Sequence, residues 1–271
     1  MKKGFIILDC AVLAAAAVLG SYYFSAARMR LDEPVFLTHY IESRQCSAGK
    51  TIALNYITNK DDDRSVVSAS FPECPELKFD IYGSDRNNRY LFHKTRNIYM
   101  QSKLEQSSAL DETLLTTVHV KFSDGSEDDF DIGRILIENI PERHEKVTSF
   151  RSGTGDNAGN SSETRNVLAD CTLTGISSVF DENCGADIRV TINGGEGSIP
   201  LSLHSGDTVT FDTTINISGP YVQNVYNIDK KLTFEDSSGN IYYDTLSNIE
   251  YTPEFSESAI RSFLRERGTI S

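Results

Sequence analysis

Tryptophan is absent from this chain of 271 residues, and methionine occurs only three times. An antibody-type immunoglobulin domain packs a tryptophan against its central disulfide, so that type of domain is excluded. The sequence also contains no Cys-x-x-Cys motif, and its five histidines follow none of the spacings typical of zinc sites. Neither a redox-active dithiol nor a structural zinc centre is predicted.

The sequence also lacks the common catalytic and nucleotide-binding motifs. The nucleophile motif G-x-S-x-G, the metalloprotease motif H-E-x-x-H and the glycine pattern of dinucleotide-binding folds are all missing. Because nothing singles out one serine as a nucleophile, we predict no catalytic residue, no cofactor and no metal ligand. The chain is therefore not predicted to be an enzyme, and a cell-surface hydrolase is the least favoured of three function classes.

Positive charge is scarce, since 26 Lys and Arg stand against 39 Asp and Glu, for a formal charge of −13. The first 30 residues carry +3, from Lys2, Lys3, Arg28 and Arg30 against Asp9, which leaves −16 (−13 minus 3) for the rest. Proteins bind nucleic acid through Lys and Arg on phosphates, so no nucleic-acid partner is predicted. An acidic body also disfavours lying flat on anionic lipid.

Long apolar runs are confined to the N-terminus. Residues 4–24, GFIILDCAVLAAAAVLGSYYF, carry a single charge, Asp9. A helix of that length measures about 31 Å, which is enough to cross the apolar core of a bilayer. We therefore predict a transmembrane helix or signal anchor within residues 1–30. The acidic remainder, residues 31–271, is expected on the extracellular side of the cell membrane.

The same segment also fits a signal peptide that is removed after export. Its Lys-Lys start and the small residues 25–27 (SAA) are typical of such a peptide and its cleavage site. The mature protein would then be secreted. An uncleaved anchor would instead use residues 22–24 (YYF) as an aromatic belt and the two following arginines as a charged stop. Both readings stay open.

Residues 1–24 also resemble the N-terminal segment of type IV prepilins, because K-K-G-F-I-I-L-D precedes an apolar helix. In that family a peptidase cuts after the glycine, and an acid at mature position five pairs with the terminal amine of a neighbouring subunit. The resemblance implies a cut after Gly4, a new terminus at Phe5 and a pairing role for Asp9. The family strongly prefers Glu at that position, and Pro34 should end or kink this helix early. No other part of the chain resembles a known family.

The rest of the chain is dominated by short β-branched and aromatic segments bounded by turn residues. Strands are predicted at 35–42, 51–58, 66–71, 76–82, 116–122, 129–140, 186–192, 207–217, 230–236 and 240–246. This pattern favours a mainly β fold with two tandem, related immunoglobulin-like β-sandwich domains, at 34–148 and 167–271. Residues 149–166, which are rich in Gly, Ser and Asn, are predicted to be a flexible linker.

Four landmarks recur between the two halves at a nearly constant offset. The matched pairs are Cys74 with Cys184, Phe122 with Phe234, Pro141 with Pro253 and Asp131 with Asp244, at offsets of 110, 112, 112 and 113. Self-similarity at a fixed spacing indicates a tandem repeat. We therefore expect the second halves of the two domains to superpose.

Four cysteines lie beyond the N-terminal segment. An exported chain meets oxidising conditions, in which an even number of cysteines forms disulfides. We predict the pairs Cys46–Cys74 and Cys171–Cys184, because each pair lies within one domain. Buried free thiols are the alternative.

The C-terminus departs from the strand pattern. Ser256 is a helix-capping residue, and Ile260, Phe263 and Leu264 follow at helical spacing before Gly268 ends the pattern. We predict a short helix that packs its apolar side on the second domain.

Two acidic clusters offer the oxygen ligands that calcium prefers, namely residues 61–63 and the acids between 124 and 131. Neither follows the spacing of an EF-hand loop. Solvated turn residues that protect edge strands from aggregation are the alternative.

Taken together, these patterns favour a membrane-anchored, exported surface protein with a non-catalytic binding, adhesion or assembly role. Its expected partners are the membrane, through residues 4–24, and another protein or a cell-surface component. The alternative is a type IV pilin-like subunit, either a pseudopilin or a minor pilin, of an envelope filament or secretion apparatus.

Overall fold

The computed structural model describes residues 2–44, 50–84, 88–105, 110–139, 147–195 and 197–270, with side chains from residue 13 onward except at 83, 84 and 248. The helical elements are α1 (Lys2–Arg28), η1 (Gly219–Gln223) and α2 (Glu257–Glu266). The strands of the first half are β1 (Val35–Phe36), β2 (His39–Ser43), β3 (Thr51–Asn59), β4 (Val66–Ser70), β5 (Phe79–Ser84), β6 (His93–Ser102), β7 (Leu110–Phe122) and β8 (Glu127–Asn139). Those of the second half are β9 (Thr148–Gly155), β10 (Asn160–Val167), β11 (Cys171–Ser177), β12 (Ala186–Ile192), β13 (Leu201–Leu203), β14 (Thr208–Ile217), β15 (Val225–Asp236) and β16 (Ile241–Tyr251).

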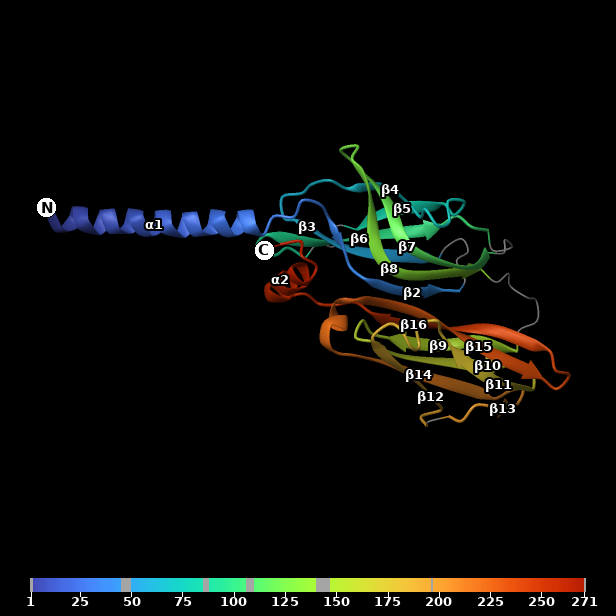
Figure 1. The fold of residues 1–271 in the computed structure, drawn as a ribbon. Coiled ribbons are helices and arrows are strands. Elements are labelled where there is room, and N and C mark those ends of the chain that lie inside the picture. Colours follow the sequence, from blue (N-terminus) through green and yellow to red (C-terminus); the bar gives the residue numbers. More distant parts are fainter. Residues whose placement is uncertain are drawn as a thin grey trace.

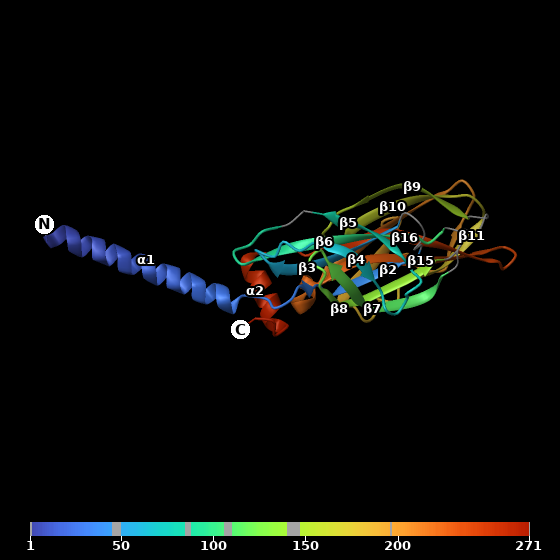
Figure 2. The same cartoon turned by 90° about the horizontal axis from the view of Figure 1, so that it is seen from above.

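The strands build two lobes that lie side by side, and α1 projects away from both as a single rod (Figure 1). The first lobe contains β1–β8 and the second lobe contains β9–β16. The view from above shows the same projection of α1 and places α2 at its base (Figure 2). The mainly β, sandwich-type fold predicted from the sequence is confirmed.

Alternation of apolar and polar residues explains why these segments form half-buried strands. In β3, the side chains of Ile52 and Leu54 are buried, while their neighbours at 51, 53 and 55 are only partly buried or exposed. In β14, Val209 and Phe211 are buried in the same alternating way. Successive side chains of a strand point to opposite faces, so one face of each strand is apolar. These faces supply the core of each lobe.

The two lobes share one strand order. In the first lobe one sheet runs β1-β3-β6-β5, and the other contains β8-β7-β4. In the second lobe one sheet runs β9-β10-β14-β12, and the other contains β16-β15-β11. When β2 and β13 are left out and the other strands are lettered along each half, both lobes have the ABED and GFC sheets of a constant-type immunoglobulin sandwich.

Two of the repeated landmarks occupy equivalent turns. Cys74 follows β4 and Cys184 follows β11. Each of these strands is the third strand of its sandwich when β2 is not counted. Each cysteine stands shortly after a fully buried phenylalanine, Phe71 or Phe180. A cysteine three residues after Phe71 and another four residues after Phe180 therefore mark the same turn in both lobes.

The second pair of landmarks is shifted by two residues. Phe122 lies in β7 and Phe234 in β15, and both are buried. The hairpin after β7 is closed by the N–H of Phe122 donating to Ser126, whereas the hairpin after β15 is closed by Asp236 donating to Asn240. Phe122 thus corresponds to Asp236. A shift of two residues keeps Phe122 and Phe234 on the same face of their strands.

The two remaining landmark pairs are Asp131 with Asp244 and Pro141 with Pro253, and the structure describes both members of the first pair only. Asp131 is an exposed residue of β8, whereas Asp244 in β16 forms an ion pair with the buried Arg165 of β10. These two aspartates therefore have different surroundings. Pro141 lies outside the described residues, so its match with Pro253 stays a prediction.

Strand β2 connects the two lobes through backbone hydrogen bonds. It pairs in parallel with β8 of the first lobe and with residues 225–228 of β15 in the second. Strand β11 pairs with residues 231–236 of β15. Strand β2 therefore pairs with the same side of β15 at the residues that β11 leaves unpaired. One sheet therefore runs through both lobes, in the order β13-β11-β15-β2-β8-β7-β4.

His39 fixes β2 in this position. Its Nδ1 lies 3.1 Å from the carbonyl oxygen of Ile132, and its Nε2 accepts a hydrogen bond of 2.8 Å from the N–H of Asn55. Burial lowers the pKa of His39 to about 4, so the ring is neutral at pH 7. Gly133 lies opposite with φ +89°, where an added Cβ would be 2.6 Å from the carbonyl oxygen of His39. Only glycine allows this approach.

The predicted flexible linker at 149–166 is wrong. These residues form most of β9 and β10, which pair with each other, and β10 also pairs with β14. The segment reads as polar because β9 is an edge strand whose side chains are largely exposed. In β10 the buried positions include the charged residues Glu163 and Arg165, which neutralise each other through an ion pair. Composition alone does not distinguish such a strand from a linker.

The predicted C-terminal helix is present, but it packs on the first lobe. Ser256 caps α2 by accepting a hydrogen bond from the N–H of Ala259, and the buried residues are Ile260, Phe263 and Leu264. Their apolar cluster draws mainly on the end of α1 and on the first lobe, with Val225 as the buried residue from the strands of the second. Its other members are Met29, Leu31, Leu37, Ile57, Ile270 and the partly buried Val35, Tyr90, Phe92 and Phe255. The helix therefore covers the first lobe where α1 leaves it.

Candidate interaction surface at the base of the N-terminal helix

Two sets of hydrogen bonds fix the end of α1 to the first lobe. The side chain of Asn59 accepts from the N–H of Leu31 at 2.9 Å and donates to the carbonyl oxygen of Leu31 at 2.7 Å. Nε2 of the buried His93 lies 2.7 Å from the carbonyl oxygen of Met29. Burial lowers the pKa of His93, which favours the neutral ring. The exit of α1 is thus held by the ends of β3 and β6, the two central strands of their sheet.

Aromatic contacts extend this attachment along the last turns of α1. The ring of Tyr22 lies 5.7 Å from the ring of Phe92, which precedes β6. The guanidinium of Arg261 in α2 stands 5.6 Å from the centre of the same Phe92 ring. Phe92 therefore contacts both helices. A pair of aromatic rings at this separation adds about 0.5–1.5 kcal/mol beyond the burial of its area.

Beyond this base, the described apolar side chains of α1 are exposed. Among them are Leu13, Val18, Leu19, Tyr23 and Phe24, each 56–69% exposed. A helix that is apolar on all sides is normally covered by protein or lipid. Within the residues whose side chains are described, however, no helix is long and apolar enough to cross a membrane.

A groove of about 400 Å³ opens between the end of α1 and the first lobe. Its apolar lining comes from Tyr22, Leu91 and Phe92, and its charged lining includes Arg30, Lys60 and Arg89. Tyr22 and Leu91 are each 46% exposed. Apolar and cationic side chains are thus both accessible at the point where the projecting helix meets the body.

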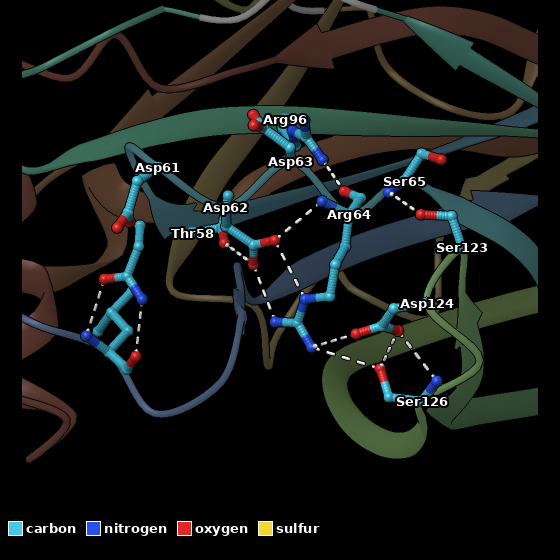
Figure 3. A network of polar contacts seen from close by, with 12 residues as sticks. Thr58, Asp61, Asp62, Asp63, Arg64, Ser65, Arg96, Ser123, Asp124 and Ser126 are labelled. Atoms are coloured by element: carbon cyan, nitrogen blue, oxygen red, sulfur yellow. Dashed lines mark hydrogen bonds and ion pairs between the residues drawn. The ribbon is translucent and has the colours of Figure 1, made fainter.

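The first acidic cluster lies next to this groove and is organised by an arginine (Figure 3). Asp62 accepts hydrogen bonds from Arg64 Nη2 at 2.8 Å, from Arg64 Nε at 3.1 Å and from the Thr58 hydroxyl at 2.7 Å. Burial alone would raise the pKa of Asp62, but these hydrogen bonds outweigh it and hold the pKa well below its usual range.

The same arginine joins the first acidic cluster to the second. Arg64 Nη1 lies 3.9 Å from Asp124 Oδ2 and donates to the hydroxyl of Ser126 at 3.3 Å (Figure 3). Asp124 also accepts from the N–H of Ser126, so it caps the hairpin between β7 and β8. Across the described part of the chain, no group of three or more His, Cys, Asp or Glu residues could hold a metal ion.

A second polar network links the lobes beside β2. Glu42 in β2 accepts a hydrogen bond from the hydroxyl of Ser178, which follows β11, and forms an ion pair with Arg44. Lys50 of the first lobe donates to Asp229 of β15 at 2.8 Å. Glu42 and Asp229 are both buried. The lobes therefore share ionic contacts as well as backbone hydrogen bonds.

Glu42 has the most unusual environment in this network. Burial raises its pKa to about 7, although the hydrogen bond from Ser178 and the charge of Arg44 act in the opposite direction. Arg44 is shared with Glu138, whose Oε2 lies 2.7 Å from Arg44 Nη1. Removing one partner from such a buried pair leaves an uncompensated charge and costs about 3–5 kcal/mol.

The predicted Cys171–Cys184 disulfide is wrong, because both residues are buried thiols that are not bonded to each other. Cys171 pairs with Asp236 at the far end of β15. Cys184 lies at the other end, where its carbonyl oxygen accepts a hydrogen bond from the hydroxyl of Tyr226. Ten residues of strand separate Tyr226 from Asp236, or roughly 33 Å. A disulfide requires Cα atoms within about 7 Å.

The remaining predicted site residues are only partly described. Cys46 lies outside the described residues, so the Cys46–Cys74 disulfide stays a prediction. The backbone of Gly4, Phe5 and Asp9 is part of α1. Their side chains lie outside the described part, so the prepilin-type roles of these residues also stay predictions.

Sequence reasoning missed the networks of Glu42, Asp229 and Arg64. The available signal was a charged residue inside a strand pattern, as in the segments THYIESR and YNIDKK. A charge at such a position is ordinary on the exposed face of a strand. Burial of Glu42 and Asp229 depends on the packing of one lobe against the other, which the pattern does not record, whereas Arg64 joins two turns within the first lobe.

The chain matches no protein-family model and no curated protein. One solved structure that it resembles contains zebrafish RET cadherin-like domains 1 to 4, with 11% sequence identity and a TM-score of 0.27. The match covers 82% of this chain and 51% of that chain, so this chain spans about half the length of that structure. A likeness of this size decides nothing about the fold, which follows from the strand order described above.

Proposed function

We propose that the protein is a single-pass, membrane-anchored surface protein whose body displays two β-sandwich lobes outside the cell membrane. One observation carries the proposal: α1 projects clear of the body (Figure 1), and its side chains Leu13, Val18 and Leu19 are exposed. In residues 4–24 the chain carries one charge, Asp9. Lipid is the surrounding that such a segment requires.

We assign the body a binding, adhesion or assembly role rather than catalysis. Its buried histidines bind backbone groups, His39 next to Ile132 and His93 next to Met29, and neither contacts a nucleophile. The strongly held acid Asp62 is engaged by Arg64 in a structural turn. These groups stabilise the sandwich, which leaves the surface for contacts with another protein or a cell-surface component.

N-terminal sequencing of the mature protein, combined with extraction of membranes at alkaline pH, tests the proposal. A chain that begins at Met1 and stays in the alkali-washed membrane supports the anchor. A start at Arg28 would replace it with a secreted protein, because the helix would have been removed. A start at Phe5 would favour the pilin-like alternative.

Protease treatment of intact cells tests the orientation. If the body is outside, added protease degrades residues 31–271 without lysis. Protection of the body until the cells are lysed would contradict the proposed orientation.

A further inference from the structure

The groove at the base of α1 concentrates positive charge in a chain that is otherwise acidic. Beyond residue 30 the chain carries −16 (−13 minus the +3 of residues 1–30). Arg30, Lys60 and Arg89 nevertheless line one groove, where Asp61 is the one acid among the described lining residues. This surface differs in charge from the body as a whole.

Two of these cations are available to a ligand. Arg30 is 3.3 Å from Asp61, and both side chains are largely exposed. Lys60 and Arg89 are exposed and form no ion pair within the described residues. The nearby acid Glu257 is already engaged, since it accepts hydrogen bonds from Leu91 and Arg261. An anion that enters the groove therefore meets unneutralised positive charge.

Apolar side chains border the same groove. Tyr22 and Leu91 are each 46% exposed, and they continue the exposed apolar surface of α1 that ends with Tyr23 and Phe24. A surface with aromatic rings, an exposed leucine and cations at one level matches the interface of a bilayer, where apolar chains give way to charged headgroups.

We propose that this groove binds the headgroup of an anionic phospholipid. The first lobe then contacts the bilayer surface directly, in addition to its connection through α1. The inference rests on the proposed function, because α1 must lie in the membrane for the groove to reach the headgroups. Lys60 and Arg89 bind the phosphate, while Leu91 and Tyr22 enter the interface beside it. The Asn59–Leu31 and His93–Met29 contacts hold the groove at a fixed angle to α1.

A separate, acidic groove would favour one orientation of the lobe on an anionic surface. It has a volume of about 490 Å³ and lies between the segment after α1, β8 and the C-terminus. Its lining includes Asp32, Glu33, Asp129 and Asp131, and it shares no lining residue with the basic groove. Anionic lipid repels this acidic surface and attracts the basic one. The orientation of the lobe therefore depends on lipid charge.

The absence of tryptophan allows one introduced tryptophan to report on each position separately. In the full chain, Leu91→Trp places the reporter in the groove, and Leu19→Trp places it on the exposed surface of α1. Each variant is reconstituted into vesicles of phosphatidylcholine alone, or of phosphatidylcholine mixed with phosphatidylglycerol. The readouts are the emission maximum and quenching by lipids brominated near the headgroup.

We expect Leu91→Trp to shift to shorter wavelength and to be quenched only when phosphatidylglycerol is present. Each Lys or Arg near an anionic surface changes partitioning about fivefold, so Lys60→Ser with Arg89→Ser should weaken the response roughly 25-fold. High salt should have a similar effect, because screening shortens the range of the attraction. The matched control is Arg151→Ser with Arg189→Ser, which removes two exposed cations from β9 and β12 and should leave the response intact.

The reporter on α1 separates the two ways of failing. If Leu19→Trp is quenched in both lipid mixtures but Leu91→Trp ignores phosphatidylglycerol, the headgroup site is wrong and the anchor stands. If the Lys60 and Arg89 variant responds like its control, the assignment of these two residues is wrong. If Leu19→Trp is quenched in neither mixture, the proposed anchor and the proposed headgroup site are both wrong.

Discussion

The side chain of Asn59 makes two hydrogen bonds to the backbone of Leu31, accepting from its N–H at 2.9 Å and donating to its carbonyl oxygen at 2.7 Å. An asparagine side chain offers this pair of contacts because its amide carries an acceptor and donors together. Leu31 is buried just beyond α1, so the contact joins the projecting helix to β3. The direction in which α1 leaves the body depends on it.

Replacing Asn59 by alanine should lower the free energy of unfolding by about 1–3 kcal/mol. Both backbone groups of Leu31 lose their partner, and an unsatisfied buried polar group carries a penalty of that size. Urea unfolding of the full chain in detergent measures the change. Asn157→Ala, at an exposed turn, is the matched control and should change stability by less than about 0.5 kcal/mol. Equal effects of the two substitutions would contradict the role of Asn59.

Glu42 should make the stability of the protein depend on pH. In the folded state its pKa is raised from 4.5 to about 7, so the folded protein holds this proton more tightly than the unfolded chain does. Protonation therefore stabilises the fold: the contribution is complete below about pH 4.5 and is lost as the pH rises through about 7.

The comparison of wild type with Glu42→Gln isolates this group, because glutamine stays neutral throughout. The unfolding free energy of wild type relative to the variant should rise by up to about 3 kcal/mol as the pH falls from 7 to 4.5. Urea unfolding across this range is the measurement. Glu235→Gln, at an exposed position of β15, serves as control. A difference between wild type and Glu42→Gln that stays constant with pH would show that Glu42 is ionised in the fold.

Phe263 should contribute strongly to stability although it lies near the C-terminus. Its side chain is 3% exposed in the cluster that α2 forms with the first lobe. Truncation of a buried phenylalanine to alanine costs about 3–5 kcal/mol through lost burial and the cavity left behind. Thermal unfolding of Phe263→Ala measures this loss, with the exposed Arg265→Ala as control. Indistinguishable melting temperatures for the two variants would mean that α2 does not cover the first lobe.

The cysteines should separate into two chemical classes in exported protein. Cys171 and Cys184 are buried thiols, and burial raises the pKa of both, which makes them slow to react while folded. Alkylation after denaturation without reductant should label these two residues. Peptide mapping under the same conditions should find Cys46 linked to Cys74. A peptide that joins Cys46 to Cys171, or a labelled Cys46, would contradict the predicted bond.

Substitution of Asp9 distinguishes a plain anchor from a pilin-like subunit. For an anchor, Asp9→Leu should leave membrane insertion intact or improve it, because a carboxylate within the apolar helix costs about 2.5–3.5 kcal/mol on insertion scales. For a pilin-like subunit, the protein should stay in the membrane but no longer enter a filament, since the partner of the terminal amine is lost. Co-purification with a filament fraction is the measurement, with Gly4→Ala to block processing and Asp9→Glu as the conservative control. Unchanged processing and co-purification in every variant would exclude the pilin-like alternative.

Local patterns were sufficient to predict the elements whose stability depends on near neighbours. Alternation in segments such as residues 51–58 predicted half-buried strands, and β3 spans Thr51–Asn59. The capping serine and the apolar spacing in residues 256–268 predicted α2 with its cap and its buried face. The matched cysteines Cys74 and Cys184 marked equivalent turns in the two lobes. In each case the residues that define the element lie close together in the sequence.

The sequence by itself determined a mainly β body of sandwich type, an apolar N-terminal segment and a capped C-terminal helix, because periodicity and composition are local properties. Only the tertiary structure decided that β2 joins both lobes in one sheet, that Glu42 is buried between them and that α2 covers the first lobe. It also placed Cys171 and Cys184 at opposite ends of β15, although only 13 positions separate them in the chain. These features depend on which surfaces meet when distant segments pack together, and burial of that kind leaves no periodic signal in the sequence.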